Sequence, residues 1–339
     1  MADPILEVDD LRLHYLTRFG DKIHAVDGVS FELRKGEILG IAGESGCGKT
    51  TLVSGLLGLY IPPLHHTSGD VRIDGKSIIG MNVEQNREQV LGRQVAMIPQ
   101  GALNSLNPTR KVKDLATDMI LSHERGLDKK VVYERLRERF GRVGLDAEHV
   151  LNSYPVALPA GTKQRVVIGI STLLNPKVVI ADEPTSALDV STQKAVVRLL
   201  FELMDQEIIS SMLFITHELP LLRHVSSRIA VMYAGEFVEL GTTEQVIFDG
   251  HQPYTRALMG SMLSAEPGQK TKKPVAIEGA PPNLKNPISG CRFAERCPVA
   301  RLDCPSTKQV LRIVAGREVR CKYAESTAQT LGDMGASAP

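Results

Sequence analysis

Eight consecutive residues are spaced to hold a phosphate group. The spacing is G-x-x-x-x-G-K-[ST], in which the glycines let successive backbone N–H groups turn toward a phosphate. Lys49 of such a loop reaches the β- and γ-phosphates, and the Thr50 hydroxyl holds Mg²⁺. We therefore predict a phosphate-binding loop. Its residues are Gly43, Glu44, Ser45, Gly46, Cys47, Gly48, Lys49 and Thr50.

The sequence on either side of this loop predicts the strand and the helix that the loop requires. Residues 37–42 form a short apolar run that leads into glycine, as a buried strand does. Residues 51–59, which begin with Thr51, carry apolar side chains at helical spacing. The N-terminus of a helix adds a partial positive charge that favours phosphate binding. Two aromatic residues ahead of the loop are candidates for stacking on adenine, Tyr15 first and Phe19 second, unless either ring packs on its own sheet.

Polar side chains follow three further apolar runs at the point where each run ends. They are Gln100, the pair Asp182 and Glu183, and His217. Ligands of α/β sheets bind at the carboxyl ends of parallel strands. We therefore expect these four side chains to serve the same site as the phosphate loop.

Each of these four side chains suits a part of phosphoryl transfer. Asp182 is predicted to anchor Mg²⁺, and Glu183 is predicted to polarise the attacking water as general base. Gln100 is predicted to ligate Mg²⁺ and to sense the γ-phosphate. His217 is predicted to hydrogen-bond that phosphate and to hold the geometry of the transition state.

Strands that alternate with helices predict an α/β domain with a largely parallel sheet. Residues 178–181 form a continuous apolar run, as a strand of a parallel sheet does, and we expect a further buried strand at 211–216. Helices are expected at about 158–174 and at 191–205. Residues 111–150 are charged and helically periodic, and we interpret them as a small helical insert.

Together these motifs resemble the nucleotide-binding subunit of an ATP-binding-cassette (ABC) transporter. The resemblance implies a RecA-like P-loop NTPase fold of class α/β, with an antiparallel β subdomain and a helical subdomain. It implies ATP and Mg²⁺ as ligands. The matching motifs are Walker A at 43–50, the Q-loop glutamine Gln100, Walker B with Asp182 and Glu183, the D-loop Ser186, Ala187, Leu188 and Asp189, and the switch histidine His217.

Within that superfamily the chain is similar to the ATPases of oligopeptide and dipeptide importers. The resemblance implies a second ABC ATPase, two transmembrane permeases and an extracellular solute-binding protein as partners, at the cytoplasmic face of the membrane. Peptides are the expected cargo, with oligosaccharides as an alternative. The segments that carry the similarity are Gln100 to Ala102, Leu106 to Pro108, His251 to Leu258 and Gly279 to Leu284.

The resemblance fails at one motif, the signature. The family has Leu-Ser-Gly-Gly-Gln or Leu-Ser-Gly-Gly-Met where this chain has Leu158, Pro159, Ala160, Gly161 and Thr162. The signature serine donates its hydroxyl to the γ-phosphate held by the opposite subunit, and proline has neither a hydroxyl nor an N–H. We therefore expect a heterodimer in which the partner supplies an intact signature. The alternative is that both substitutions are tolerated and both sites work.

Four cysteines lie close together near the C-terminus. Cys291, Cys297, Cys304 and Cys321 supply four thiols in a segment with little core-forming sequence. A segment this small usually needs disulfides or a bound metal to be stable. The candidates are an iron–sulfur cluster, tetrahedral Zn²⁺, thiols without a ligand, or disulfides. The similarity to importer ATPases with a cysteine-rich C-terminal domain favours [4Fe–4S].

The amino-acid composition argues against some classes of protein. The 339 residues carry a net charge of +1, with 4% aromatic residues and no tryptophan, which argues against nucleic-acid binding. We expect a nucleotide-binding domain at 1–240, with its helical subdomain at about 104–170, and an extension at 241–339 that includes a linker, the cysteine motif at 291–321 and a disordered tail. With no apolar run of membrane-spanning length and no apolar signal core, a cytoplasmic location is expected.

Two alternative functions remain open at this level. A soluble ABC-type ATPase, such as a repair or translation factor, usually carries long coiled-coil insertions or two cassettes. A regulatory protein that binds nucleotide without turnover would not need Glu183 and His217.

Overall fold

The computed structural model describes residues 3–101, 104–186, 188–262, 277–285 and 288–326. Ala102 of the predicted Q-loop segment, Ala187 of the D-loop, and parts of the predicted linker and tail lie outside the described residues. The chain divides into two compact units that interleave along the sequence. The first comprises Met1–Leu6, Leu33–Glu37 and Arg72–Ile215, and the second comprises Glu7–Glu32, Ile38–Val71 and Thr216–Pro339.

Three parallel strands form the sheet of the first unit. β6 (Val95–Ile98) pairs with β7 (Val178–Asp182), and β7 pairs with β8 (Ser211–Ile215). Every residue of β7 and β8 is buried, as expected for strands of a parallel sheet that helices cover on both faces. The sheet therefore confirms the predicted α/β class and brings the carboxyl ends of these strands to one edge.

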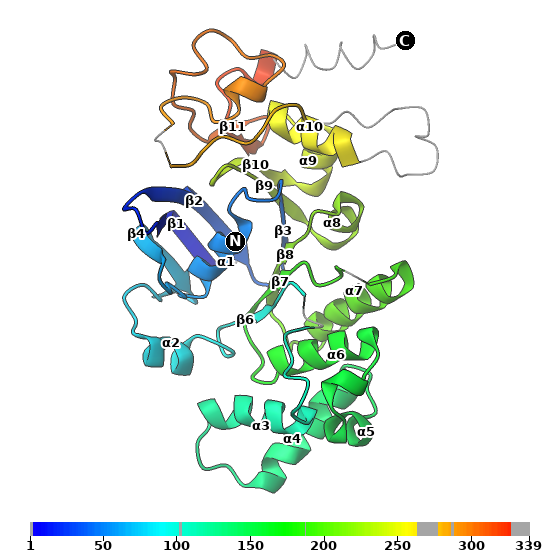
Figure 1. Cartoon of the computed structure of the whole chain (residues 1–339). Coiled ribbons are helices and arrows are strands. Elements are labelled where there is room, and N and C mark those ends of the chain that lie inside the picture. Colours follow the sequence, from blue (N-terminus) through cyan, green and yellow to red (C-terminus); the bar gives the residue numbers. More distant parts are fainter. Residues whose placement is uncertain (1–2, 102–103, 187, 263–276, 286–287, 327–339) are drawn as a thin grey trace. The chain divides into compact units, whose positions relative to one another are not determined.

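The predicted helical insert contains the helices α3 (Val112–His123), α4 (Lys129–Arg142) and α5 (Ala147–Asn152) (Figure 1). Buried side chains from all three helices belong to one apolar core. Leu136 and Phe140 pack there with Ile120, and all three side chains are fully buried. These helices belong to the first unit together with several others. In chain order the helices and short elements are β5 (Lys76–Ser77), α2 (Val83–Gln89), α3 (Val112–His123), α4 (Lys129–Arg142), α5 (Ala147–Asn152), the 3₁₀ turn η2 (Pro155–Ala157), α6 (Ala160–Ser171) and α7 (Val190–Asp205).

The second unit carries the phosphate loop between a buried strand and a helix. β3 (Ile38–Ala42) precedes the loop and is buried throughout, and α1 (Lys49–Leu56) follows it, as predicted. β3 pairs in parallel with β9 (Arg228–Tyr233), and β9 pairs with the antiparallel β10 (Glu236–Thr242). The N-terminal strands β1 (Pro4–Leu16) and β2 (Lys22–Arg34) lie in one sheet with β4 (Leu64–Ile73), in the order β2-β1-β4-β5.

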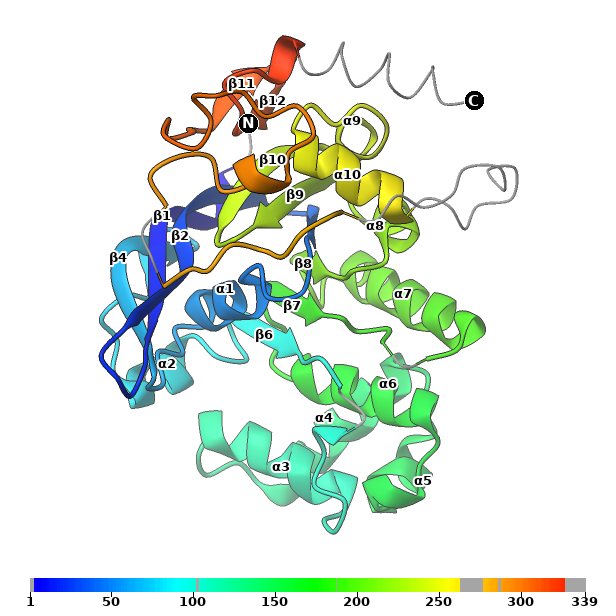
Figure 2. The same ribbon diagram turned by 45° about the horizontal axis from the view of Figure 1, so that its top comes forward.

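The C-terminal part of the second unit adds a β-hairpin to β10. β12 (Arg317–Val319) pairs antiparallel with β10 and with β11 (Arg312–Val314). Figure 2 shows this hairpin beside β10, with the helices of this region close by. Two helices follow β10, α9 (Thr243–Phe248) and α10 (Pro253–Met262). The short helix α8 (Leu219–Val225) precedes β9, and the 3₁₀ turn η4 (Ala294–Arg296) follows α10.

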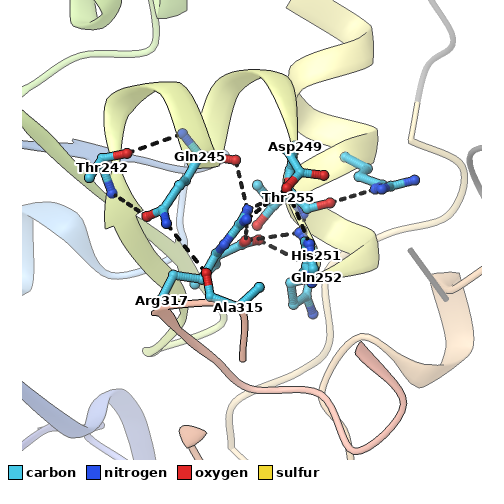
Figure 3. A network of polar contacts seen from close by, with 11 residues as sticks. Thr242, Gln245, Asp249, His251, Gln252, Thr255, Ala315 and Arg317 are labelled. Atoms are coloured by element: carbon cyan, nitrogen blue, oxygen red, sulfur yellow. Dashed lines mark hydrogen bonds and ion pairs between the residues drawn. The ribbon is translucent and has the colours of Figure 1, made fainter. Parts of the chain in front are cut away.

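A buried polar network holds the hairpin, β10 and the α9–α10 connection together (Figure 3). Glu239 of β10 is fully buried and accepts hydrogen bonds from the backbone N–H groups of His251 and Gln252. Arg317 of β12 lies 3.8 Å from Glu239 and 2.7 Å from the carboxylate of Asp249. The connection between α9 and α10 is therefore fixed, because two of the backbone N–H groups in this connection donate to the buried carboxylate of Glu239.

Candidate nucleotide-binding and catalytic site

The loop at 43–50 connects β3 to α1. The N-terminal residue of α1 is Lys49, whose ammonium donates to the carbonyl oxygens of Gly43, at 2.7 Å, and Glu44, at 3.0 Å. The lysine ammonium thus bonds to the backbone of the first two residues of the loop. Thr50 is exposed, which leaves its hydroxyl accessible to Mg²⁺.

Two positions of the loop admit only glycine. Gly43 has a φ of 155°, and a Cβ there would come within 2.3 Å of the carbonyl oxygen of Met232. Gly48 has a φ of 111°, and its Cβ would lie 2.2 Å from the carbonyl oxygen of Ala25. Any side chain at either position would displace backbone, so the loop depends on these two glycines.

Tyr15 lies close to the phosphate loop in the second unit. Its hydroxyl is 3.1 Å from the hydroxyl of Thr51, the residue that follows the loop motif. Phe19 is 76% exposed, and its ring carries the guanidinium of Arg18 at 4.8 Å. The exposed ring of Phe19 and the half-buried ring of Tyr15 both remain candidates for stacking on adenine.

Glu183 and Gln100 meet in the first unit at the ends of their strands. The side-chain amide of Gln100 donates to the Glu183 carboxylate at 3.0 Å. Glu183 has a φ of 49°, a left-handed conformation that is rare for glutamate, and its backbone N–H donates to the carbonyl of Ile215 at 2.8 Å. This bond holds the unusual turn in place, and the turn places the carboxylate beside Gln100. Asp182, the last residue of β7, is buried.

The signature segment begins α6, and Pro159 stands at its N-cap rather than in its first turn. Pro159 supplies no side-chain hydrogen bond to the helix and is exposed, as is Ala160, the first helical residue. Gln164, one turn into the helix, is buried, and its amide donates to the carbonyl of Pro184 at 2.7 Å. The signature helix is therefore fixed to the residue that follows Glu183.

Asp189 of the D-loop caps α7. Its carboxylate accepts from the backbone N–H groups of Ser191 and Thr192, both at 3.0 Å, and from their hydroxyls. The bond from the Ser191 hydroxyl contributes most, and together these bonds hold the pKa of Asp189 below its usual range. Ser186 is half-buried and donates its N–H to the carbonyl of Glu183 at 3.1 Å. His217 is exposed, belongs to the second unit and follows β8 by two residues.

The four C-terminal cysteines line one small pocket. Burial raises the pKa of Cys291 and of Cys297 to about 11, and it also raises the pKa of Cys321. All four thiols, including that of Cys304, are free. Within the described ranges, no set of three or more His, Cys, Asp or Glu side chains is arranged to hold a metal ion. The thiols thus share one pocket without forming a ligand set there.

Two residues that contact the phosphate loop were not found by sequence reasoning. The hydroxyl of Tyr254 accepts a hydrogen bond from the backbone N–H of Glu44 at 2.9 Å. Arg296 forms two bonds to the Glu44 carboxylate, at 2.7 and 3.0 Å. Both residues lie more than 200 positions from the loop in the sequence, and neither belongs to a pattern that links it to phosphate binding.

Comparison with known proteins decides the family. The profile of the family described as "ABC transporter" matches residues 26–186, and that described as "Oligopeptide/dipeptide transporter, C-terminal region" matches residues 238–304. The dipeptide transport ATP-binding protein DppD of Caldanaerobacter subterraneus is 38% identical over 95% of this chain and 97% of its own length. The chain belongs to the ABC transporter family of ATP-binding proteins. It is therefore an ABC-type ATPase.

Further relatives and solved structures agree with this assignment. The oligopeptide transport ATP-binding protein OppF of Salmonella typhimurium is 37% identical, over 94% of this ABC ATPase and 95% of its own length. The ATP-binding cassette MJ0796, in a dimeric post-hydrolysis state with ADP and phosphate, has a TM-score of 0.61 at 23% identity, over 70% of this chain and 98% of its own. That likeness confirms the predicted fold. Among the described residues, no helix combines the length and the apolar character needed to span a membrane.

Proposed function

We propose that this chain hydrolyses ATP to power an importer for oligopeptides or dipeptides, at the cytoplasmic face of the cell membrane. The observation that carries the proposal is the extent of the similarity. Relatives named as dipeptide and oligopeptide transport ATP-binding proteins match 94–95% of the chain, including the region of the C-terminal family profile. Similarity to transport proteins over nearly the whole chain does not favour a role as a repair or translation factor. Two permeases and a solute-binding protein complete the proposed complex.

The proposed roles of the site residues follow from their chemistry. Walker A, 43–50, binds the phosphates, and Thr50, Gln100 and Asp182 would supply oxygen ligands to Mg²⁺, the donor type that Mg²⁺ prefers. Glu183 is the general base, because Gln100 holds its carboxylate at the end of β7. Tyr15 and Thr51 contact the nucleotide, and His217 hydrogen-bonds the γ-phosphate. Ser186 and Asp189 belong to the D-loop.

The exposed, uncapped start of α6 supports a functional asymmetry. Pro159 and Ala160 offer neither a hydroxyl nor the close backbone approach of glycine to a phosphate held by a partner subunit. Loss of one hydrogen bond to a charged group costs about 1.5–3 kcal/mol. We infer a heterodimer in which the partner's intact signature completes this chain's site, whereas the partner's own nucleotide faces the defective signature.

Restoring the signature is expected to raise ATP hydrolysis. The double substitution Pro159→Ser with Ala160→Gly returns the hydroxyl and the glycine, so turnover at the affected site should rise roughly 10- to 100-fold. Steady-state hydrolysis by the purified complex measures this. The matched control is Pro159→Ala with Ala160→Gly, which returns the N–H without the hydroxyl. Equal rates of ATP hydrolysis for the two double variants and the wild-type complex would contradict the proposed asymmetry.

The four thiols line one pocket without being arranged there as a ligand set, and we propose that they bind a [4Fe–4S] cluster, with zinc as the alternative. The group would tie together a segment that has little apolar core of its own. Protein purified without oxygen is expected to carry about four irons per chain and to absorb visible light. Colourless protein with zinc instead of iron would select the alternative. Protein without either metal would contradict a Cys₄ site.

The transport proposal is tested by uptake in cells. Cells that lack this chain are expected to lose uptake of radiolabelled di- and oligopeptides, and the wild-type chain should restore it. Lys49→Ala should not restore it, because the lysine contact to the phosphates is lost. Loss of oligosaccharide uptake with peptide uptake intact would contradict the peptide assignment while leaving the ATPase assignment standing.

A further inference from the structure

The phosphate loop is held from outside by one arginine of the cysteine-rich segment. Arg296 lies directly before Cys297, and its side chain is only 5% exposed. Its guanidinium binds both carboxylate oxygens of Glu44, at 2.7 and 3.0 Å. Glu44 is the second residue of Walker A, which the proposed function assigns to phosphate binding. A planar, bidentate pair of this kind fixes direction as well as distance.

All five N–H donors of Arg296 have an acceptor. Two serve Glu44, one reaches the Tyr233 hydroxyl at 3.2 Å, and two reach the carbonyls of Ile277, at 3.2 Å, and Glu278, at 2.9 Å. An arginine has five such donors, so the guanidinium is fully saturated. The bond to Glu44 raises the pKa of Arg296, so its charge is permanent. A buried, saturated arginine cannot change its position without breaking several bonds.

A second contact to the same loop residue comes from an aromatic cluster. The hydroxyl of Tyr254, which is fully buried, accepts from the backbone N–H of Glu44 at 2.9 Å. The Tyr254 ring packs on Tyr233, at 4.5 Å, and on Phe293, at 5.4 Å between ring centres. Glu44 is therefore held by its side chain and by its backbone at once. On its inner side, its carbonyl accepts from Lys49.

We propose that Arg296 is a positioning residue of the nucleotide site, which acts by holding Glu44 so that the phosphate loop keeps its binding-competent shape. The inference rests on the proposed role of Walker A. Arg296 does not touch the nucleotide, so it affects affinity rather than the chemical step. Nucleotide affinity then depends on the integrity of the cysteine-rich segment that carries Arg296.

The test is a double-mutant cycle on nucleotide affinity in the full complex, with MgATP as the probe. Arg296→Met and Glu44→Gln should each raise the Kd about tenfold, and the double variant should also raise it about tenfold rather than a hundredfold, because both remove the same contact. Arg296→Lys keeps one charged bond and should fall between the wild type and Arg296→Met. At saturating ATP, the kcat of Arg296→Met and of Arg296→Lys should stay within about threefold of the wild type.

Two controls make the outcome decisive. Arg317→Met removes an equally buried arginine of the same C-terminal region, 4% exposed, that does not bond to the loop. It should lower stability and leave the Kd within about twofold. Single effects that multiply in the double variant, or an unchanged Kd for Arg296→Met, would overturn the inference. Lys49→Ala should abolish binding; if wild type and Lys49→Ala bind MgATP equally, the proposed role of Walker A itself fails.

Discussion

Replacing Glu183 by glutamine is expected to lower the kcat of ATP hydrolysis by about 10²- to 10⁴-fold, the usual contribution of a general base. Glutamine has the same shape and can still accept the bond that the Gln100 amide donates at 3.0 Å. It cannot take a proton from water. ATP binding should therefore persist, and the Kd for MgATP should change by less than about threefold.

The control for this substitution is Glu202→Gln on α7. Glu202 is exposed and pairs with Arg198 one turn away on the helix, so the same chemical change is made away from the site. Its kcat should equal that of the wild type. Hydrolysis by Glu183→Gln within tenfold of the wild type would mean that another group activates the water, and His217 would then be the next residue to replace.

Replacing Arg317 by methionine is expected to cost about 3–5 kcal/mol of unfolding free energy, the typical cost of breaking a buried ion pair from one side. Glu239 is fully buried, and Arg317 is the cation beside it, at 3.8 Å. The same substitution also removes the 2.7 Å contact to Asp249. Urea unfolding measures the loss. The exposed pair Arg198–Glu202 provides the contrast, because Arg198→Met should cost at most about 0.5 kcal/mol.

The loss caused by Arg317→Met should depend on pH. Burial raises the pKa of Glu239, and Arg317 opposes this rise. A carboxyl with a raised pKa contributes stability below its ordinary pKa and loses that contribution as pH rises through the raised value. Without Arg317 the pKa of Glu239 rises further, so the gap between variant and wild type should narrow as pH falls from about 8 to about 5. A gap that widens in acid would contradict this account of Glu239.

Local sequence patterns were sufficient for the phosphate loop and the strand ends. The glycines at 43 and 48 are required by positive φ and by nearby carbonyls, so the motif itself carries the geometry. Gln100 and Glu183 meet because β6 and β7 are adjacent parallel strands in register. Such contacts follow from periodicity and topology, which a single sequence displays.

Contacts made by residues outside the periodic elements were not predictable in this way. Tyr254 is the second residue of α10, which follows the connection whose backbone N–H groups donate to the buried carboxylate of Glu239. Arg296 lies in a segment whose only visible pattern is its cysteines. Its bond to Glu44 depends on tertiary packing across 252 positions. The left-handed backbone of Glu183 likewise has no sequence signal, since glutamate rarely adopts it.

The most direct test of the account is purification of the membrane complex through a tag on this chain, without oxygen, followed by mass spectrometry of its subunits. In the purified complex we expect two permeases and a second ATPase. This second ATPase should differ from this chain and carry an intact Leu-Ser-Gly-Gly signature. A complex with two copies of this chain would contradict the asymmetry derived from Pro159 and Ala160. Recovery of this chain without any membrane protein would contradict the importer itself.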